Sequence, residues 1–279
     1  MDTTRLTRFD RAGLTFDVID SGPVDGAPVV LLHGFPQRAT AWAAVSEELH
    51  ADSLRTYALD QRGYSPGARP QSRFAYAVDE LVADVMALID AIGTPVHLVG
   101  HDWGSAVAWS VAARHPSSVR SLTAVSVAHP AAFMRSMLSS SQAAKSFYIL
   151  MFQVPVVPER MLSRRGGLGE RMLRASGMDT RMIETFRDEI VADGALRGGL
   201  GYYRSLPRSV RGFAGRVSVP TTYVWSDGDT ALARRGAELT PQFVTGPYEL
   251  EVLSGATHWI LDQNPDELAE IIRRRIASA

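Results

Sequence analysis

The sequence contains no cysteine. Disulfide bridges, thiolate nucleophiles and zinc–thiolate sites are therefore excluded. Long apolar runs are also missing, because stretches such as residues 28–32 are far too short to cross a bilayer. Residues 1–13 carry three arginines and no apolar core, so we expect no secretory signal there and a cytoplasmic location.

No charge of one sign dominates the composition. The chain has 29 basic and 30 acidic residues and a net charge of −1, which predicts no binding to nucleic acid and no general attraction to an anionic membrane. Hydrophobic residues make up 46% and charged residues 21%, values that exclude a disordered chain. The length of 279 residues predicts one large domain or a domain with an insertion.

Short apolar runs alternate with helical patterns along most of the chain. The runs are continuous and rich in β-branched residues, which is typical of strands buried on both faces. They cover residues 27–32, 54–59, 95–99, 122–127, 220–225 and 248–253. Helices are predicted over 79–92, 103–114 and 265–276, and an antiparallel hairpin over 6–9 and 14–19. This alternation indicates an α/β fold with a parallel sheet covered by helices on both faces.

The pattern changes between residues 131 and 214, where short helices rather than buried strands are predicted. We therefore divide the chain into a core, residues 1–130 and 215–279, and a helical insertion, residues 131–214. The insertion has 13 basic and 7 acidic residues. We interpret this excess of basic over acidic residues as a solvated outer face, because runs of charged residues usually lie on such a face.

A candidate nucleophile lies where a predicted strand meets a predicted helix. Residues 100–104 read GHDWG, which has the form of a nucleophile elbow, G-x-S-x-G, with Asp102 in the serine position. Flanking glycines allow the cramped turn that would raise residue 102 above the sheet edge. The alternative is that Asp102 only caps its helix.

An aspartate in this position narrows the chemistry. A carboxylate that attacks an acyl carbon gives an anhydride, which is a poor route. A carboxylate that attacks an sp³ carbon displaces an alkoxide or a halide and leaves an alkyl ester on the enzyme. Asp102 therefore favours an epoxide or alkyl halide substrate over an ester or peptide.

A base and an acid are predicted at the ends of later strands. His258 follows the strand 248–253, and Asp229 follows the strand 220–225, so both lie where open α/β sheets place their sites. Asp229 would hold the His258 tautomer and stabilise the imidazolium. Asp227 stays open as an alternative to Asp229. His101 and His33 are expected to brace the site through hydrogen bonds.

The loop after the first buried strand predicts an oxyanion hole. Residues 33–36 read HGFP, and the amides of Phe35 and Trp103 are the expected pair of donors. Pro36 is predicted to follow either a cis bond or an ordinary trans bond.

Taken together, HGFP, the DQRGYSPG segment at 60–67, GHDWG and the GATHW segment at 255–259 resemble the α/β-hydrolase superfamily, specifically its epoxide hydrolases. The resemblance implies an α/β-hydrolase fold with a mostly parallel eight-stranded sheet, flanking helices and residues 131–214 as a helical cap. It also implies the chain order nucleophile, acid, base, seen here as Asp102, Asp229 and His258. Ser226 stands where the family usually has glycine, which keeps Asp227 open as the acid.

The same resemblance implies two cap tyrosines that hydrogen-bond the epoxide oxygen. Tyr148 matches the first, and the Tyr202-Tyr203 pair matches the second. Neighbouring helical residues point about 100° apart, so only one of the pair faces the site, and we favour Tyr203. The alternative for each tyrosine is a packing role with a hydrated hydroxyl. The side chains expected to bind substrate are Phe35, Pro36, Trp103, Phe152 and Trp259.

The predicted function is conversion of a small apolar epoxide and water to a vicinal diol, with a role in detoxification. No metal, cofactor, nucleic acid or membrane is expected, and the chain is expected to be a monomer or homodimer. A haloalkane or haloacid dehalogenase with the same three residues is the alternative. Against it, Phe35 replaces the tryptophan or asparagine common at that position in related dehalogenases, and residues 131–214 contain no tryptophan. A non-catalytic ligand-binding protein would bind substrate without turnover.

Overall fold

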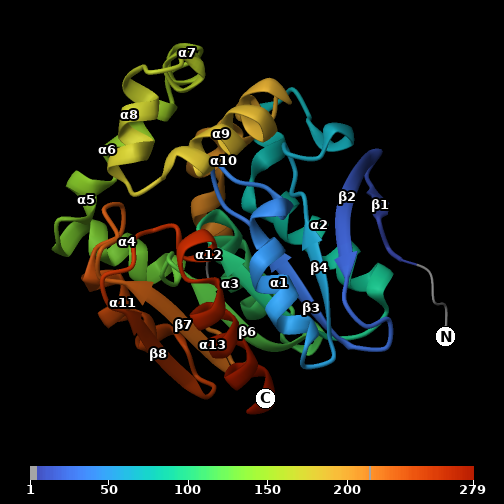
Figure 1. Ribbon diagram of the computed structural model, residues 1–279. Helices are drawn as coiled ribbons and strands as arrows, with labels where there is room; N and C mark the ends of the chain where they lie inside the picture. Colours follow the sequence, from blue (N-terminus) through green and yellow to red (C-terminus); the bar gives the residue numbers. More distant parts are fainter. Residues whose placement is uncertain (1–4, 214) are drawn as a thin grey trace.

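The computed structural model describes residues 5–213 and 215–279, with Val210 and Arg211 described by their backbone alone. Residues 1–4 and Ala214 lie outside the described residues. Residues 1–4 belong to the segment in which we expect no secretory signal, and Ala214 is the last residue of the predicted insertion. Eight strands form one sheet in the order β1-β2-β4-β3-β5-β6-β7-β8 (Figure 1). Their bounds are β1 Arg8–Arg11, β2 Leu14–Ser21, β3 Ala27–Leu32, β4 Leu54–Leu59, β5 Val96–His101, β6 Val119–Val125, β7 Thr221–Ser226 and β8 Tyr248–Leu253.

The sheet is mostly parallel, as expected. Strands β4, β3, β5, β6, β7 and β8 pair in parallel. The predicted hairpin is β1 and β2, and β2 pairs antiparallel with β4. Strand β6 begins at Val119, three residues before the prediction, because the polar side chains of Arg120 and Ser121 interrupt the apolar pattern in the sequence.

Helices cover both faces of the sheet. Alternate residues of β3 show the two faces, since Val29 and Leu31 join one apolar core and Val30 and Leu32 join the other. The first core is closed by α1 (Ala43–His50) and α13 (Pro265–Ala277), and the second by α2 (Val78–Ile92) and α3 (Trp103–Arg114). Helix α1 was not among the predicted helices, and neither were α11 (Arg234–Leu239) and α12 (Ile260–Gln263).

The segment between β6 and β7 is helical in the residues described, as predicted. It contains α4 Pro130–Ser139, α5 Gln142–Lys145, α6 Phe147–Phe152, α7 Val157–Ser163, α8 Leu168–Ala175, α9 Thr180–Phe186, the π-helix η5 Arg187–Ala192 and α10 Leu196–Ser209. Figure 1 shows α6 to α9 gathered at one end of the sheet. The α/β-hydrolase fold expected from the sequence is therefore the observed fold.

Helix α10 joins the helical segment to the core through a close backbone approach. A Cβ atom on Gly198 would lie 2.3 Å from the carbonyl oxygen of Gly63. Nearby, the Tyr202 hydroxyl donates to the Arg62 carbonyl at 2.8 Å. Glycine is required at position 198, because a Cβ atom there would clash with the Gly63 backbone, which cannot rotate away as a flexible side chain can.

We expect Gly198→Ala to destabilise the protein by about 1–3 kcal/mol, the usual cost of overpacking a closed contact. Gly236→Ala in α11 is the matched control, because its new Cβ would meet two side-chain atoms and no backbone, the Ala128 Cβ at 3.1 Å and the Ser136 Oγ at 4.0 Å. Urea unfolding of both variants measures the difference. Equal unfolding midpoints would show that the α10 contact can relax without cost.

Candidate active site

Asp102 lies at a strained turn between β5 and α3. Its backbone has φ 52° and ψ −116°, a left-handed value that is unusual for a residue with a side chain. Two glycines make the turn possible. A Cβ on Gly100 would lie 2.3 Å from the Gly104 carbonyl oxygen, and a Cβ on Gly104 would lie 2.1 Å from that of Leu32. The GHDWG segment thus forms the predicted elbow.

The Asp102 carboxylate is held by the two predicted amides. The Phe35 amide donates to Oδ1 at 2.8 Å, and the Trp103 amide also donates to this carboxylate. Burial raises the pKa of Asp102, while the nearby His258 and the two amides act to lower it. Gly34 leaves room for the carboxylate, because a Cβ there would lie 2.4 Å from the Asp102 Cβ.

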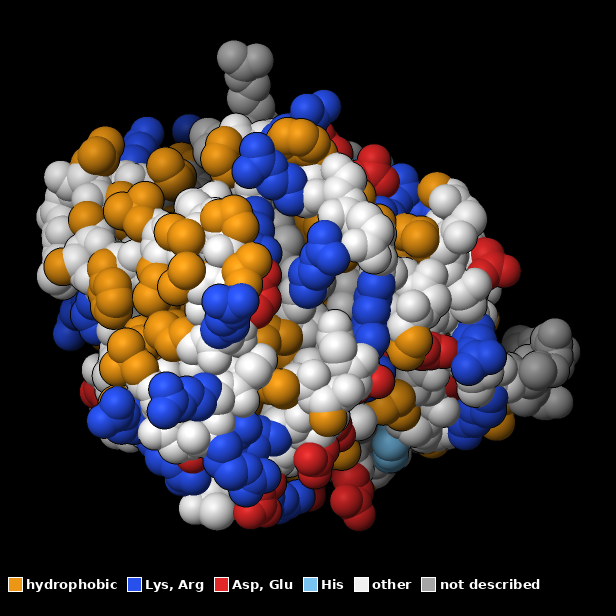
Figure 2. All heavy atoms as spheres, turned by 90° about the horizontal axis from the view of Figure 1, so that it is seen from above, with side chains coloured by type: hydrophobic (Ala, Val, Ile, Leu, Met, Phe, Trp, Pro, Cys, Tyr) orange, Lys and Arg blue, Asp and Glu red, His pale blue; other side chains and the backbone are white. Residues whose placement is uncertain are grey.

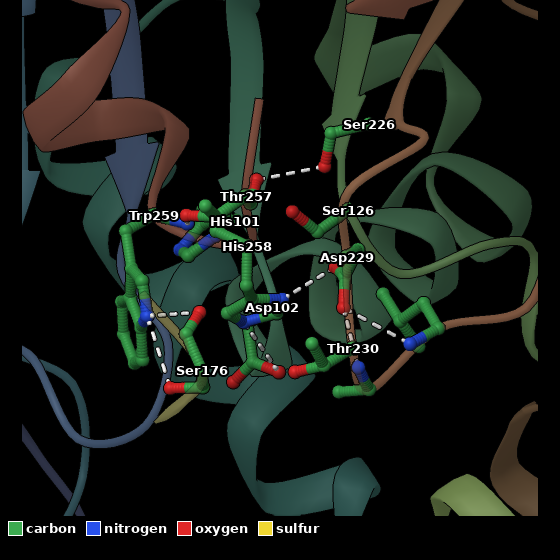
Figure 3. A network of polar contacts seen from close by, with 12 residues as sticks. His101, Asp102, Ser126, Ser176, Ser226, Asp229, Thr230, Thr257, His258 and Trp259 are labelled. Atoms are coloured by element: carbon green, nitrogen blue, oxygen red, sulfur yellow. Dashed lines mark hydrogen bonds and ion pairs between the residues drawn. The ribbon is translucent and has the colours of Figure 1, made fainter. Parts of the chain in front are cut away.

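His258 lies between two carboxylates (Figure 3). Its Nδ1 is 2.7 Å from Asp229 Oδ2, and its Nε2 is 3.7 Å from Asp102 Oδ2. The second distance exceeds a hydrogen bond, so Nε2 faces Asp102 without being bonded to it. Burial acts to lower the pKa of His258, but the charge and hydrogen bond of Asp229 and the charge of Asp102 outweigh it and raise the pKa to about 9.

Asp229, rather than Asp227, contacts the histidine. Asp229 is 3% exposed, and its Oδ1 accepts from the amides of Ala231 and Leu232 at 2.7 and 3.0 Å. Asp227 instead accepts from the Gly255 amide and the Ser254 hydroxyl on the exposed loop. Burial acts to raise the pKa of Asp229, but His258 and the two amides lower it overall.

Serine in place of the usual glycine leaves this geometry intact. The Ser226 hydroxyl donates to the Thr257 carbonyl at 2.8 Å, which ties the end of β7 to the His258 loop. His101 supports the same loop, because its Nε2 donates to the His258 carbonyl at 3.0 Å. Burial lowers the pKa of His101 to about 3, so this ring is neutral.

His33 braces the opposite side of the site. Its Nε2 accepts from the Gln61 amide at 3.2 Å, and its Nδ1 donates to the Gly34 carbonyl at 3.1 Å. Burial lowers its pKa to about 4. Both predicted bracing histidines therefore hold backbone near the site through hydrogen bonds.

An aromatic cluster lies against the Asp102 loop. The ring of Tyr203 packs edge-on against Trp103, Phe35, Phe152 and Tyr148 with centroid distances of 5.1, 5.4, 5.0 and 5.9 Å. Burial raises the pKa of Tyr148 and Tyr203, and the Asp102 charge raises both further. Both phenols are therefore neutral hydrogen-bond donors at pH 7.

The Tyr202 hydroxyl points elsewhere, although the Tyr202 ring also packs edge-on against Trp103 at a centroid distance of 5.4 Å. Its hydroxyl is bonded to the Arg62 carbonyl at 2.8 Å, and its side chain is 1% exposed. Of the two neighbouring tyrosines, Tyr203 is the one that also contacts Phe35 and Tyr148. That Tyr203 rather than Tyr202 binds the epoxide oxygen stays a prediction.

The remaining expected substrate-binding residues have different surroundings. Pro36 is buried and follows a cis peptide bond, one of the two predicted geometries. Trp259 packs edge-on against the His258 ring at 5.1 Å. Its indole nitrogen donates to the Ser176 carbonyl at 3.1 Å, and the ring joins a small core with Met178 and Met182. Trp259 therefore also links the His258 loop to the helical segment.

Some residues of the site carry no sequence signal. The amides of Ala231 and Leu232 hold Asp229 through their backbone, which no residue type specifies. Lys145 donates to the Asp229 carbonyl at 2.9 Å from α5. Only its status as the single lysine of the chain could have drawn attention to it.

Residues 5–213 and 215–279, which the structure describes, carry neither a metal-binding cluster nor a membrane-spanning helix. No group of three or more His, Cys, Asp or Glu side chains comes together there in a way that could hold a metal ion. Within the same residues, no helix is long and apolar enough to cross a membrane.

Comparison with known proteins places the chain in a family. The family described as alpha/beta hydrolase fold matches residues 27–265. Epoxide hydrolase 3 of Xenopus tropicalis is 32% identical, covering 95% of this chain and 76% of the relative. Epoxide hydrolase A of Mycobacterium tuberculosis is 30% identical, covering 95% of this chain and 94% of the relative. The chain belongs to the epoxide hydrolase family of the α/β-hydrolase superfamily.

Solved structures of the epoxide hydrolase family agree with this assignment. A Bacillus megaterium epoxide hydrolase in complex with an inhibitor has a TM-score of 0.85 and 25% identity, over 97% of this chain and 99% of that one. The family identifies this chain as a hydrolase, and the relatives given above carry the name epoxide hydrolase.

We expect Asp229→Asn to lower the pKa of His258 from about 9 toward the ordinary imidazole value of about 6.5, because the charge that favours the imidazolium is removed. The neutral ring would then predominate at pH 8, where the protonated ring predominates in the unaltered protein. NMR titration of the imidazole signals measures this, with His258→Gln used to assign the peak. Asp227→Asn is the control and should leave the titration unchanged; an equal effect of the two variants would contradict the assignment.

Proposed function

We propose that this chain is an epoxide hydrolase that works through an alkyl ester on Asp102. One observation carries the proposal. The Phe35 amide holds Oδ1 of a buried carboxylate to which the Trp103 amide also donates, Oδ2 faces the His258 Nε2 at 3.7 Å, and two neutral phenols lie in the adjoining aromatic cluster. This arrangement supplies a nucleophile, a base and an acid for a strained ether.

In the first step, Asp102 Oδ2 attacks a ring carbon of the epoxide. A new carbon–oxygen ester bond forms as the ring carbon–oxygen bond breaks, and the departing oxygen takes a proton from a tyrosine. Alkoxides are poor leaving groups at neutral pH, so donation from Tyr148 and Tyr203 lowers the barrier. Both tyrosines remain protonated in the free enzyme because burial and the Asp102 charge raise their pKa.

In the second step, water attacks the ester carbonyl carbon of Asp102. His258 takes the proton from the water, and Asp229 stabilises the imidazolium that results. Oδ1 becomes the oxyanion, and the Phe35 and Trp103 amides already donate to this carboxylate. The acyl–oxygen bond then breaks as the departing oxygen takes the proton that His258 received from the water, so the diol leaves with the original Oδ2. Asp102 keeps the oxygen from water, and the second water proton, released as this carboxylic acid ionises, returns the tyrosinate of the first step to a phenol.

Alkylation also prepares His258 for its role as a base. The Asp102 charge is one of the causes that raise the pKa of His258 to about 9. The ester carries no charge, so the pKa of His258 falls once the intermediate forms. The histidine is therefore more readily deprotonated when water must be activated than in the free enzyme.

The aromatic cluster supports a small apolar epoxide as the substrate. Phe35, Trp103 and Phe152 supply apolar walls beside Asp102, with Pro36 and Trp259 next to them. We propose residues 131–214 as a cap that carries the two tyrosine donors. The cytoplasmic location and the role in detoxification remain predictions, as does the monomeric or dimeric state.

A dehalogenase would need donors for a departing halide. The residues just described include two indoles, but the Trp259 N–H already donates to the Ser176 carbonyl, which leaves Trp103. The second expected donor position holds Phe35, which has no donor in its side chain. Two neutral phenols suit an alkoxide better, because they can transfer a proton as the bond breaks.

We expect one turnover of styrene oxide in ¹⁸O-water, with enzyme in excess, to label Asp102 and leave the released diol unlabelled. Mass spectrometry of the peptide containing Asp102 and of the diol measures both. His258→Gln should accumulate protein heavier by the mass of the epoxide, because no base activates the water. A bromoalkane is the control substrate and should give no bromide. Label in the diol alone would overturn the ester mechanism, and bromide release at a comparable rate would favour the dehalogenase.

We expect Tyr148→Phe or Tyr203→Phe to lower kcat/KM by about 10-fold, and the double variant by about 100-fold or more, since general acid catalysis contributes about 10²–10⁴-fold. Tyr202→Phe is the matched control. Its hydroxyl binds the Arg62 carbonyl, so its loss should lower the free energy of unfolding by about 1 kcal/mol with kcat/KM unchanged. A double variant as active as the unaltered enzyme would remove the role assigned to the phenols.

A further inference from the structure

The helical segment carries most of the exposed large hydrophobic side chains. Thirteen are exposed among the described residues, and eight of them come from α4 to α8 and the intervening loop. We call these eight the apolar face: Met134, Leu138, Phe147, Leu150, Val154, Val156, Val157 and Leu168. Figure 2, seen from above, shows hydrophobic side chains gathered on the side of the molecule where α4 to α8 lie in Figure 1. Patches of this kind mark interaction surfaces.

The charge around the apolar face is positive. Residues 131–178 contain seven basic residues and two acidic ones. Both acids are neutralised within the protein, Glu159 by Arg204 and Glu170 by Arg187. Four exposed arginines next to the apolar face form no ion pair with any described residue: Arg160, Arg164, Arg165 and Arg171.

Helix α6 connects the apolar face to the candidate active site. On one side of this short helix Phe147 is 57% and Leu150 is 76% exposed. On the other side Tyr148 and Phe152 contact each other and Tyr203. The same six residues thus supply both an exposed apolar surface and a proton donor for the site.

We propose that the apolar face docks on an anionic lipid surface. Exposed apolar side chains would enter the boundary between headgroups and acyl chains, and the unpaired arginines would bind acidic headgroups. The charge favours this occupant over a second copy, because pairing this face with itself would bring one arginine cluster against another. The net charge of −1 conceals this local excess of positive charge, which is why composition alone predicted no attraction to an anionic membrane.

Docking in this orientation gives the site access to substrate dissolved in lipid. Apolar epoxides partition into hydrocarbon, and α6 would lie between the bilayer and Asp102. This consequence rests on the proposed function, whereas lipid binding itself does not. Binding is therefore measured without turnover, so that failure of one proposal is distinguished from failure of the other.

The test is sedimentation of the full chain with vesicles of phosphatidylcholine mixed with phosphatidylglycerol, and with vesicles of phosphatidylcholine alone. We expect binding to the anionic vesicles that weakens with salt, and at least about 10-fold weaker binding to the neutral ones. Leu138→Ser combined with Leu150→Ser should reduce the partition coefficient by about 10-fold or more. Arg164→Gln combined with Arg165→Gln should reduce it by about 5-fold for each arginine.

Leu250→Ser is the matched control, because Leu250 is an exposed leucine of β8, outside the apolar face. It should leave vesicle binding unchanged. Equal binding of the control and the Leu138/Leu150 variant would overturn the proposal. So would a failure to bind anionic vesicles combined with a dimer, seen by analytical ultracentrifugation, that the Leu138/Leu150 variant dissociates. That result would make the face an interface between two copies.

Discussion

The backbone turn at Asp102 is the constraint on which the rest of the site depends. Asp102 adopts a left-handed conformation there although it has a side chain. Carbonyl oxygens lie so close to Gly100 and Gly104 that a Cβ atom would not fit at either position. The turn places the carboxylate at the end of a buried parallel strand and at the start of a helix. Those are the positions where backbone amides are free to bind an anion. The strain is local, and the packed sheet on both sides maintains it.

A buried negative charge at this turn shapes the ionisation of its neighbours. Asp102 raises the pKa of His258 and of both facing tyrosines. Each group is thereby kept protonated until the charge is removed. In the proposed mechanism alkylation of Asp102 removes that charge. The same step in which a tyrosine donates its proton therefore also lowers the pKa of His258, which acts as the base in the following step. Asp229 remains ionised beside His258, because two backbone amides and the histidine lower its pKa.

The helical segment has two chemically different sides. Its inner side closes the aromatic cluster over Asp102 and is joined to the core by the Tyr202 and Trp259 hydrogen bonds. Its outer side exposes apolar residues among unpaired arginines. Helix α6 is short enough for one turn to serve both sides. Movement of the helical segment at a lipid surface would therefore also move Tyr148, which belongs to α6.

The sequence alone determined the elements and the chemistry that local patterns specify. Buried strands such as 27–32, the glycines around Asp102 and the histidine after the last strand are set by residue type and spacing, so they could be predicted without coordinates. Tertiary structure alone brought Asp229 rather than Asp227 to His258 and directed the Tyr202 hydroxyl to the Arg62 carbonyl, because each contact depends on which side of a loop or helix packs against the core. It also brought the Ala231 and Leu232 amides to Asp229 and gathered the apolar face from separate helices. Backbone amides and surfaces assembled from distant segments have no signature in a linear pattern, since they exist only once long-range packing has set the distances between them.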